Sequence, residues 1–440
     1  MKRFALVALV AALLFSVVSS ASATELKVRG NIDVYGMWSA NLYDYDSDNA
    51  DGDNYTTNQR MRAYFDYVAN ENLKAVLGLE LDNDWGDGTA ADWGTDGKGN
   101  IEVKHAYLDF TFPDTTVNVQ AGLQYVALPS VFGNPVFDDD AAAITVSAAI
   151  NDMFGVAVGY TRGTDRSTSF TGSGIDNDDK DMAFIAAPIT MDGFSVAPYF
   201  AYAMVGENTD NTSDSIIIDE DGEIAIKPAS AGALEDDMDI WVVGFNAELT
   251  MFDPLTFAAD VIYGEGDTDD YETKGWYGAL AASYKFDMLT ATLFTTYFSG
   301  ADEDEDEDNY LPTLAEGWGL TPYVGGVRAF STSWDTFSGI DADMNLASWV
   351  VGLKLAKISF IDKLSHDLTA AYVMGTSDED ADIAFDEEDS AWEVYLVNKY
   401  MIYENLAAIN ELGFFAPDFD DDDREDDSSY FATVGFQYKF

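Results

Sequence analysis

The sequence lacks cysteine entirely, and it has only two histidines and 22 lysine and arginine residues among 440. Without cysteine the chain can form no disulfide bond, thiolate metal site, cysteine nucleophile or lipid-modified N-terminal cysteine. Its 80 acidic residues give a formal net charge of −58. A surface of this sign repels a phosphate backbone, so nucleic acid is excluded as a partner.

Long apolar runs are also scarce, and the clearest one lies at the N-terminus. Two basic residues precede the apolar stretch 4–18, and Ala21-Ser22-Ala23 offers small residues for cleavage. This order is typical of a secretory signal peptide over residues 1–23, and the apolar stretch is shorter than the ~20 residues of a membrane-spanning helix. We expect the mature chain to begin at Thr24, with a net charge of −60 because two basic residues are removed with the leader.

The remaining sequence alternates between apolar and polar residues in segments of roughly ten residues, as expected for strands with two different faces. This pattern accounts for a composition that is 47% hydrophobic despite the high charge. In the first segment one face collects Leu26, Val28, Ile32, Val34, Trp38 and Leu42, and the other collects Lys27, Arg29, Asn31, Asp33 and Asn41. The acidic residues concentrate between the segments.

Short and long connections alternate between these segments. The long ones cover residues 44–57, 83–100, 126–141, 163–180, 206–237, 264–274, 299–346, 375–390 and 415–428. Short turns on one rim and long loops on the other are typical of an outer-membrane barrel. Nine long loops predict an all-β, transmembrane antiparallel β-barrel of about 18 strands, formed by residues 24–440 as one domain. A barrel of 16 strands stays open, because residues 299–346 and 391–413 can be divided in two ways.

Alternation alone does not say which face is the interior, and a soluble β-sandwich would also alternate. The signal peptide, the aromatic residues near segment ends and the terminal Phe440 favour a membrane barrel. The polar face is then the interior. A polar interior in a barrel this wide must be hydrated, which predicts a channel for ions and small hydrophilic solutes.

Several stretches resemble the homotrimeric outer-membrane porins of sulfate-reducing bacteria and, more distantly, the general trimeric porins. They are Glu71-Asn72-Leu73-Lys74-Ala75-Val76, His105-Ala106-Tyr107-Leu108-Asp109-Phe110, Leu128-Pro129-Ser130, Phe132-Gly133-Asn134-Pro135, Tyr403-Glu404-Asn405-Leu406 and the closing aromatic strand. The resemblance implies a trimer with three pores and recognition of Phe440 by the barrel-assembly machinery. It also implies that loop 83–100, with Trp85 and Trp93, latches onto a neighbour.

The few basic residues are unevenly distributed. Lys27, Arg29, Arg60, Arg62 and Lys74 all have polar-face parity on the first three strands, which predicts a basic wall. In general porins the third long loop folds into the barrel, and here that loop carries Asp138, Asp139 and Asp140. The resemblance therefore implies a constriction in which these acids face the basic wall. The alternative is that the basic residues only offset the acidic interior.

The acidic runs Asp302 to Asp308 and Asp420 to Asp423 are expected to be solvated loop surface. Since no stretch keeps EF-hand spacing, we expect no defined metal site and no cofactor, only delocalised Ca²⁺ or Mg²⁺ at the outer rim beside lipopolysaccharide. The strongly negative mouth predicts a moderate preference for cations that weakens as salt rises.

The sequence also bears on two other functions, a barrel enzyme and a solute-selective porin. A barrel enzyme would need a nucleophile and base on one face, whereas His366 lies between Ser365 and Asp367, which point the other way; His105 is expected in the upper lumen. The sequence therefore predicts no enzyme. A porin selective for sugars or anions is the stronger alternative, since aromatic side chains reach the polar face at Tyr35, Tyr43, Tyr64 and Tyr107.

Overall fold

The computed structural model describes residues 25–42, 45–48, 54–86, 100–165, 179–207, 215–218, 224–227, 237–268, 272–301, 307–308, 310–315, 317–330, 347–379, 385–420 and 424–440. The expected signal peptide, Tyr43, Trp93 and most of the run Asp302 to Asp308 lie outside these ranges. Within them, no helix is long and apolar enough to span a membrane.

The described chain is built from strands. Their bounds are β1 (Glu25–Ala40), β2 (Asn54–Asn70), β3 (Leu73–Asp84), β4 (Asn100–Thr111), β5 (Val117–Ala127), β6 (Asp138–Ala149), β7 (Gly155–Asp165), β8 (Asp179–Ala186), β9 (Ile189–Met191), β10 (Phe194–Val205), β11 (Ser215–Ile218), β12 (Ile224–Lys227), β13 (Met238–Phe252), β14 (Leu255–Asp267), β15 (Glu272–Lys285), β16 (Thr290–Phe298), β17 (Glu307–Asp308), β18 (Ser348–Ile361), β19 (Leu364–Gly375), β20 (Ser390–Tyr403), β21 (Leu406–Asp418) and β22 (Ser429–Lys439).

The strands close into one antiparallel barrel, in which β1 pairs with both β2 and β22. β8 and β9 both pair with β10 and count as one strand, interrupted at Pro188 because proline has no amide hydrogen for the ladder. The two-residue β17 pairs parallel to β15 and is not part of the wall, and β11 and β12 form a separate hairpin. The barrel therefore has 18 strands, which confirms the predicted fold and rules out 16.

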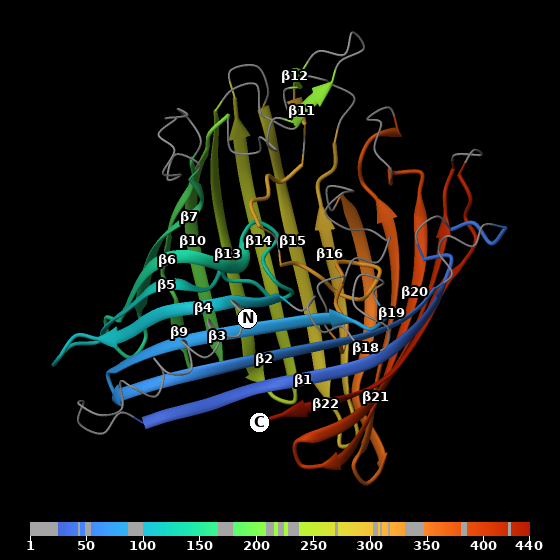
Figure 1. Ribbon diagram of the computed structural model, residues 1–440, viewed down its shortest axis with the longest axis horizontal. Helices are drawn as coiled ribbons and strands as arrows, with labels where there is room; N and C mark the ends of the chain where they lie inside the picture. Colours follow the sequence, from blue (N-terminus) through green and yellow to red (C-terminus); the bar gives the residue numbers. More distant parts are fainter. Residues whose placement is uncertain are drawn as a thin grey trace.

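Long and short connections separate to opposite rims, as predicted (Figure 1). Strand pairs such as β13 and β14 or β20 and β21 are joined by turns of two residues, Asp253-Pro254 and Glu404-Asn405. Residues 299–347 join β16 to β18 at the other rim, although β16 and β18 are neighbours in the wall. In Figure 1 the short turns that join β13 to β14 and β20 to β21 lie at the bottom.

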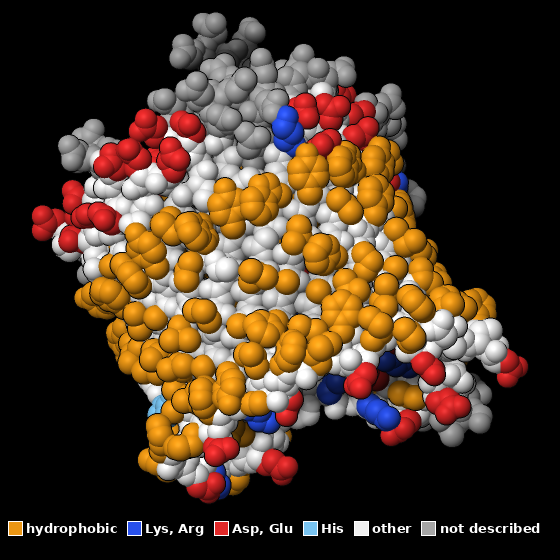
Figure 2. Space-filling view, turned by 180° about the vertical axis from the view of Figure 1, so that it is seen from behind, with side chains coloured by type: hydrophobic (Ala, Val, Ile, Leu, Met, Phe, Trp, Pro, Cys, Tyr) orange, Lys and Arg blue, Asp and Glu red, His pale blue; other side chains and the backbone are white. Residues whose placement is uncertain are grey.

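The outer surface carries an apolar belt between two charged rims (Figure 2). Large apolar side chains stand exposed on successive strands of the wall: Phe245, Phe257, Leu280, Leu293, Trp349 and Leu353. Aromatic side chains mark both edges of the belt, with Trp38, Trp276 and Trp392 toward the long loops and Phe112, Phe252, Phe360 and Tyr403 toward the short turns. This is the surface that a bilayer covers, so the polar face is the interior.

Two details of the sequence interpretation were wrong. Leu42 is not on the outer face but 2% exposed in the core, because β1 ends at Ala40 and the left-handed backbone at Asn41 (φ 52°) breaks the alternation. Asp138, Asp139 and Asp140 begin strand β6 rather than belonging to the third long loop, since their backbone pairs with β5 from Ala127 to Tyr125.

Candidate functional site

The described residues of two loops fold into the barrel instead of standing above it. L3 comprises residues 128–137 between β5 and β6, and L7 comprises residues 299–347 between β16 and β18. L3 reaches across the barrel interior to β14, where Asp260 accepts hydrogen bonds from the Val131 amide (2.7 Å) and the Ser130 hydroxyl (3.1 Å). The Asn134 amide side chain donates to the Tyr199 hydroxyl of β10 at 3.0 Å. L3 is therefore held both near its start and in its middle.

L3 and L7 are joined backbone to backbone. The amides of Leu314, Gly317 and Gly319 in L7 donate to carbonyls of L3 at 3.0 to 3.1 Å, and the Asp138 amide donates back to L7 at 2.8 Å. The contact is close enough to require glycine at 133, where φ is +82° and an added Cβ would lie 2.0 Å from the Gly317 carbonyl oxygen. The two loops therefore form one continuous layer inside the barrel, called here the inner layer.

L7 continues around the inner wall from β15 to β1. The Trp318 indole donates to the Tyr277 hydroxyl of β15 at 3.2 Å, and the Thr321 hydroxyl donates to Glu393 of β20. The Tyr323 ring stacks on Phe415 of β21, with centroids 4.8 Å apart. Aromatic and polar anchors thus alternate along the loop, and each one fixes the inner layer to another strand.

The last anchor is a buried ion pair. Arg328 of L7 donates to Glu411 of β21 at 3.1 Å, and the two side chains are 2% and 0% exposed. The same carboxylate accepts the Ala329 amide at 2.8 Å and the Tyr395 hydroxyl at 2.5 Å. Phe330 follows, stacked on Tyr35 of β1 with centroids 4.7 Å apart. Buried charge of this kind is stable only when its partners are all in place.

The predicted basic wall lies away from these anchors, on β1, β2 and β3. Lys27, Arg29, Arg60, Arg62 and Lys74 share the inner face, as the strand registers require. Most of them keep solvent contact: the side chains of Arg62, Lys74 and Arg29 are 25%, 39% and 53% exposed. Inner-face residues under the inner layer, such as Thr296 and Glu393, are 0% exposed. The water-accessible part of the lumen therefore borders β1 to β4.

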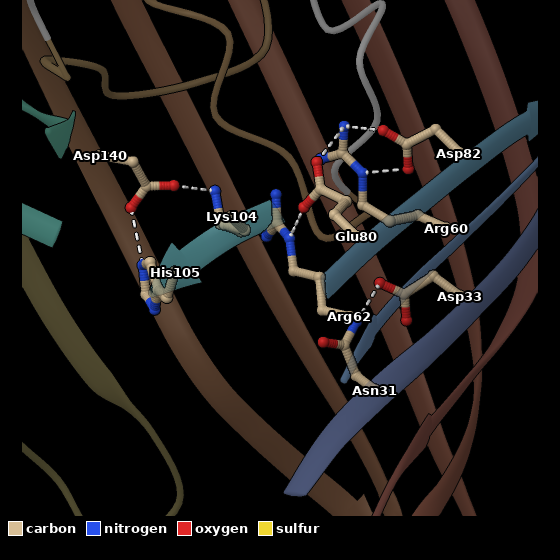
Figure 3. Close-up of polar contacts among 9 residues, drawn as sticks. All are labelled: Asn31, Asp33, Arg60, Arg62, Glu80, Asp82, Lys104, His105 and Asp140. Carbon is tan, nitrogen blue, oxygen red and sulfur yellow. Dashed lines mark hydrogen bonds and ion pairs between the residues drawn. The ribbon is translucent and has the colours of Figure 1, made fainter. Parts of the chain in front are cut away.

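Each of these basic residues pairs with an acid on its own or a neighbouring strand, so the wall is not uniformly basic. Figure 3 shows the pairs of Arg60 and Arg62. Arg60 donates to Asp82 at 2.7 Å and lies 3.7 Å from Glu80. Arg62 also pairs with Glu80. The remaining pairs are Arg29 with Asp66 at 3.3 Å, Lys74 with Asp109 at 3.2 Å and Lys27 with Glu25 at 3.6 Å. We call this surface the charged wall.

Lys104 is a member of the charged wall that the sequence interpretation missed. The pairing of β3 with β4 shifts between Gly78 and Leu79, so Lys104 is the extra residue of a β-bulge. A bulge re-aims a side chain, and here Lys104 and His105 both reach Asp140, with His105 Nε2 2.9 Å from its carboxylate. The sequence held a signal, because the exposed apolar residues change parity between Val103 and Leu108.

The acids predicted for the constriction are thus engaged locally. Asp140 bridges to β4 as described, and Asp138 accepts the Tyr125 hydroxyl and the Asn134 amide, the latter at 3.3 Å. Asp139 is exposed. Asp138 and Asp140 therefore bind residues next to them in the fold. Acidic and basic side chains pair between neighbouring strands of the wall, and these loop-proximal acids do not face the basic residues across the lumen.

Acidic groups also meet at the long-loop rim. Carboxylate oxygens of Asp46, Glu425 and Asp427 all lie within 4.8 Å of one another. Hydrogen bonds from Ser47 lower the pKa of Asp427, which therefore stays charged. A hydrogen bond with the Asp420 carboxyl raises the pKa of Glu388 to about 7. The rim therefore combines fixed negative charge with a carboxyl that titrates near neutrality.

The histidine flanked by serine and aspartate does not form a triad with them. Ser365 and Asp367 line a cavity inside the barrel, whereas His366 bonds through Nδ1 to Asn398 at 2.6 Å on the other face of the wall. Adjacent residues of a strand point to opposite faces, so their side chains cannot converge.

No protein-family model matches the sequence, and no curated protein matches it. Among solved structures the chain is similar to OccK11 (OpdR) of Pseudomonas aeruginosa, at 10% identity over 94% of this chain and 96% of that one, with a TM-score of 0.54. The outer membrane protein OprD of P. aeruginosa is 9% identical over 96% of both chains, with a TM-score of 0.53. OccK8 (OprE) of P. aeruginosa is 9% identical over 95% and 99%, with a TM-score of 0.54. At these identities the likeness establishes the fold, a closed antiparallel barrel of 18 strands.

Proposed function

We propose that this protein is an outer-membrane porin, a water-filled channel for passive diffusion of ions and small hydrophilic solutes. The observation that carries the proposal is the barrel interior. An inner layer of L3 and L7 covers one side, and a water-accessible wall of paired charges borders the other. Such a lumen lets hydrated solutes pass and filters them by size and charge. The similar structures support the proposal, since OprD is an outer membrane protein.

Ion selectivity follows from two charge distributions. The acidic long loops concentrate cations at the mouth, and this field is screened beyond roughly 10 Å at moderate salt. Inside, each arginine of the charged wall is matched by carboxylates, so the wall does not reverse the preference of the mouth. We expect a moderate preference for K⁺ over Cl⁻ that weakens as salt rises.

The double variant Arg60→Ala plus Arg62→Ala should prefer cations more strongly, because Glu80 and Asp82 lose their partners. The measurement is the reversal potential across a KCl gradient. The charge-matched control is Lys285→Ala plus Lys363→Ala, which removes two lysines at the end of β15 and in the turn before β19. A wild-type channel that prefers chloride would contradict the role given to the loops. Unchanged selectivity in the double variant would place both arginines outside the ion path.

We propose that the protein assembles as a homotrimer, because its sequence resembles the homotrimeric porins of sulfate-reducing bacteria. Trp85 is exposed and binds Gln59 of its own chain through the indole nitrogen at 3.0 Å. It stands at the base of the proposed latch, of which residues 87–99 lie outside the described ranges. Deleting 87–99 should lower the temperature at which the trimer dissociates in detergent gels. An unchanged dissociation temperature would remove the latch role.

Other partners are proposed at the two rims. The acids of the long-loop rim would attract Ca²⁺ or Mg²⁺, and these cations would bridge to lipopolysaccharide. The test is the pKa of Glu388 with and without calcium, which bound calcium should lower. An unchanged pKa would argue against cation binding at this rim. Phe440 would present the closing strand to the barrel-assembly machinery. Its amide and carbonyl pair with Gly30 at 3.0 and 2.9 Å and seal the barrel.

A solute-selective porin is the second candidate. Arg29 lies over the Tyr64 ring at 4.4 Å, and Tyr64, His105 and Tyr107 form a row of rings on the charged wall. Sugars could stack on such a row, whereas Tyr35 is covered by Phe330. Block of the ion current by one sugar at low concentration would favour this candidate over the general porin.

A further inference from the structure

A cavity of about 310 Å³ lies inside the barrel, between the end of L7 and the inner faces of β18 to β22. L7 contributes Leu320 and the segment 327–329 to its lining. The wall contributes one lysine from each of three strands: Lys354 of β18, Lys399 of β20 and Lys439 of β22. We call this cavity the lysine pocket.

The three lysines differ from the other basic residues of the lumen in their pairing. Within the described ranges no carboxylate lies within 4.0 Å of Lys354, Lys399 or Lys439, whereas the basic residues of the charged wall all have one. The fourth cation of the lining, Arg328, is matched by Glu411.

Few acids oppose these lysines. Asp367 is the acidic residue of the lining, and one of its oxygens already accepts the Lys357 amide at 2.6 Å. Asp33 acts on Lys439 electrostatically, but beyond ion-pair distance. The chain has 80 acidic residues and only 22 basic ones. It is therefore unusual that three lysines line one cavity with so few carboxylates near them.

Like charges that share a cavity repel one another, and the repulsion grows where protein displaces water. A bound anion relieves it. The hydroxyls of Ser365 and Thr369, which also line the cavity, can donate as well, whereas the side chain of Gln437 already bonds Asp33. Lysine acts as a point charge toward oxyanions, so three of them on separate strands suit a ligand with several oxygens and more than one charge.

We propose that the lysine pocket binds a small inorganic oxyanion carrying two negative charges. The site lies in the lumen of the proposed channel and depends on it only for access. It would hold the anion beside the diffusion path, in a protein whose outer mouth repels anions. A multiply charged oxyanion is favoured over chloride because it can contact several ammonium groups at once.

The test is calorimetric titration of the purified full-length protein in detergent with inorganic phosphate, at low ionic strength and mildly alkaline pH. We expect saturable binding of one phosphate per chain, which sulfate competes with and equimolar chloride does not. Lys399→Gln should weaken binding at least several-fold, and Lys399→Arg should retain most of it. Lys285→Gln is the matched control, because it removes the same charge from the end of β15, outside the pocket.

Absence of saturable binding to the wild type, or equal weakening by Lys285→Gln and Lys399→Gln, would overturn the proposal. Folding of each variant is checked by the far-ultraviolet spectrum, and the charge-retaining arginine variant separates loss of charge from loss of structure. Binding in detergent does not require conduction, and conduction is measured in KCl without phosphate. A failed anion site and a failed channel therefore give different results.

Discussion

Replacing residues 302–346 with a short glycine and serine linker should raise single-channel conductance several-fold. The replaced segment carries Trp318, Tyr323, Val324 and Phe330, which are at most 3% exposed and fill the lumen along β15 to β1. A short linker can close the gap, because Tyr297 of β16 and Trp349 of β18 are paired neighbours. Water and ions would enter the volume that L7 leaves.

The same variant should admit larger solutes, and its current should be noisier because L3 loses its hydrogen bonds to L7. Conductance in planar bilayers and uptake of sized neutral sugars by liposomes measure both effects. Trp318→Ala serves as a graded comparison and should give a much smaller rise. Unchanged conductance in the linker variant, with the barrel folded, would mean that L7 does not limit the pore.

Exchanging Glu411 for alanine should release the end of L7 from the wall. Arg328 would be left as a buried charge without its carboxylate, and breaking a buried pair in this way costs about 3–5 kcal/mol. The Ala329 amide and the Tyr395 hydroxyl would lose their acceptor as well. The variant avoids this free-energy cost if the Arg328 side chain moves into water. We therefore expect the end of L7 to leave the wall while the barrel stays closed.

Limited trypsin digestion of the folded protein measures this release. In the wild type the bond after Arg328 should resist cleavage, since the side chain is 2% exposed. Glu411→Ala should be cut there rapidly, and Glu411→Gln, which keeps an acceptor but not the charge, should be intermediate. Glu388→Ala on the rim is the control and should behave as wild type. Equal protection of Glu411→Ala would show that the ion pair does not hold the loop.

The barrel itself could be predicted from the sequence because strand alternation and loop length are local properties. Leu26, Val28 and their counterparts face lipid, and the segment 391–413 resolves into β20 and β21 around Glu404-Asn405. The parity rule also placed the five basic residues on one face correctly. It could not place Lys104, because a bulge suspends the alternation on which the rule depends.

The inner layer was only half predicted. The resemblance predicts that L3 folds into the barrel, whereas the acidic run Asp302 to Asp308 gives L7 the pattern of a solvated loop. The aromatic and aliphatic residues between Tyr310 and Phe330 are the sequence signal for a buried L7, since a solvated loop has no need of so many. Their partners on β15, β20, β21 and β1 are distant in sequence, so no local pattern identifies the contacts.

The pairing of charges was also beyond sequence reasoning. Parity assigns Arg60 and Arg62 to the lumen, but their contacts with Glu80 and Asp82 depend on the register between β2 and β3. A shift of one residue would have sent these acids to the lipid face. The lysine pocket depends likewise on which strands L7 covers.

Single-channel recording of the purified wild-type protein in a planar bilayer with KCl tests the central claim most directly. We expect discrete, uniform conductance steps with a current proportional to voltage, because a permanently open, water-filled lumen lies beside the charged wall. Correctly folded protein that inserts into the bilayer but gives no conductance steps would contradict it, because L3 and L7 would then seal the barrel rather than narrow it.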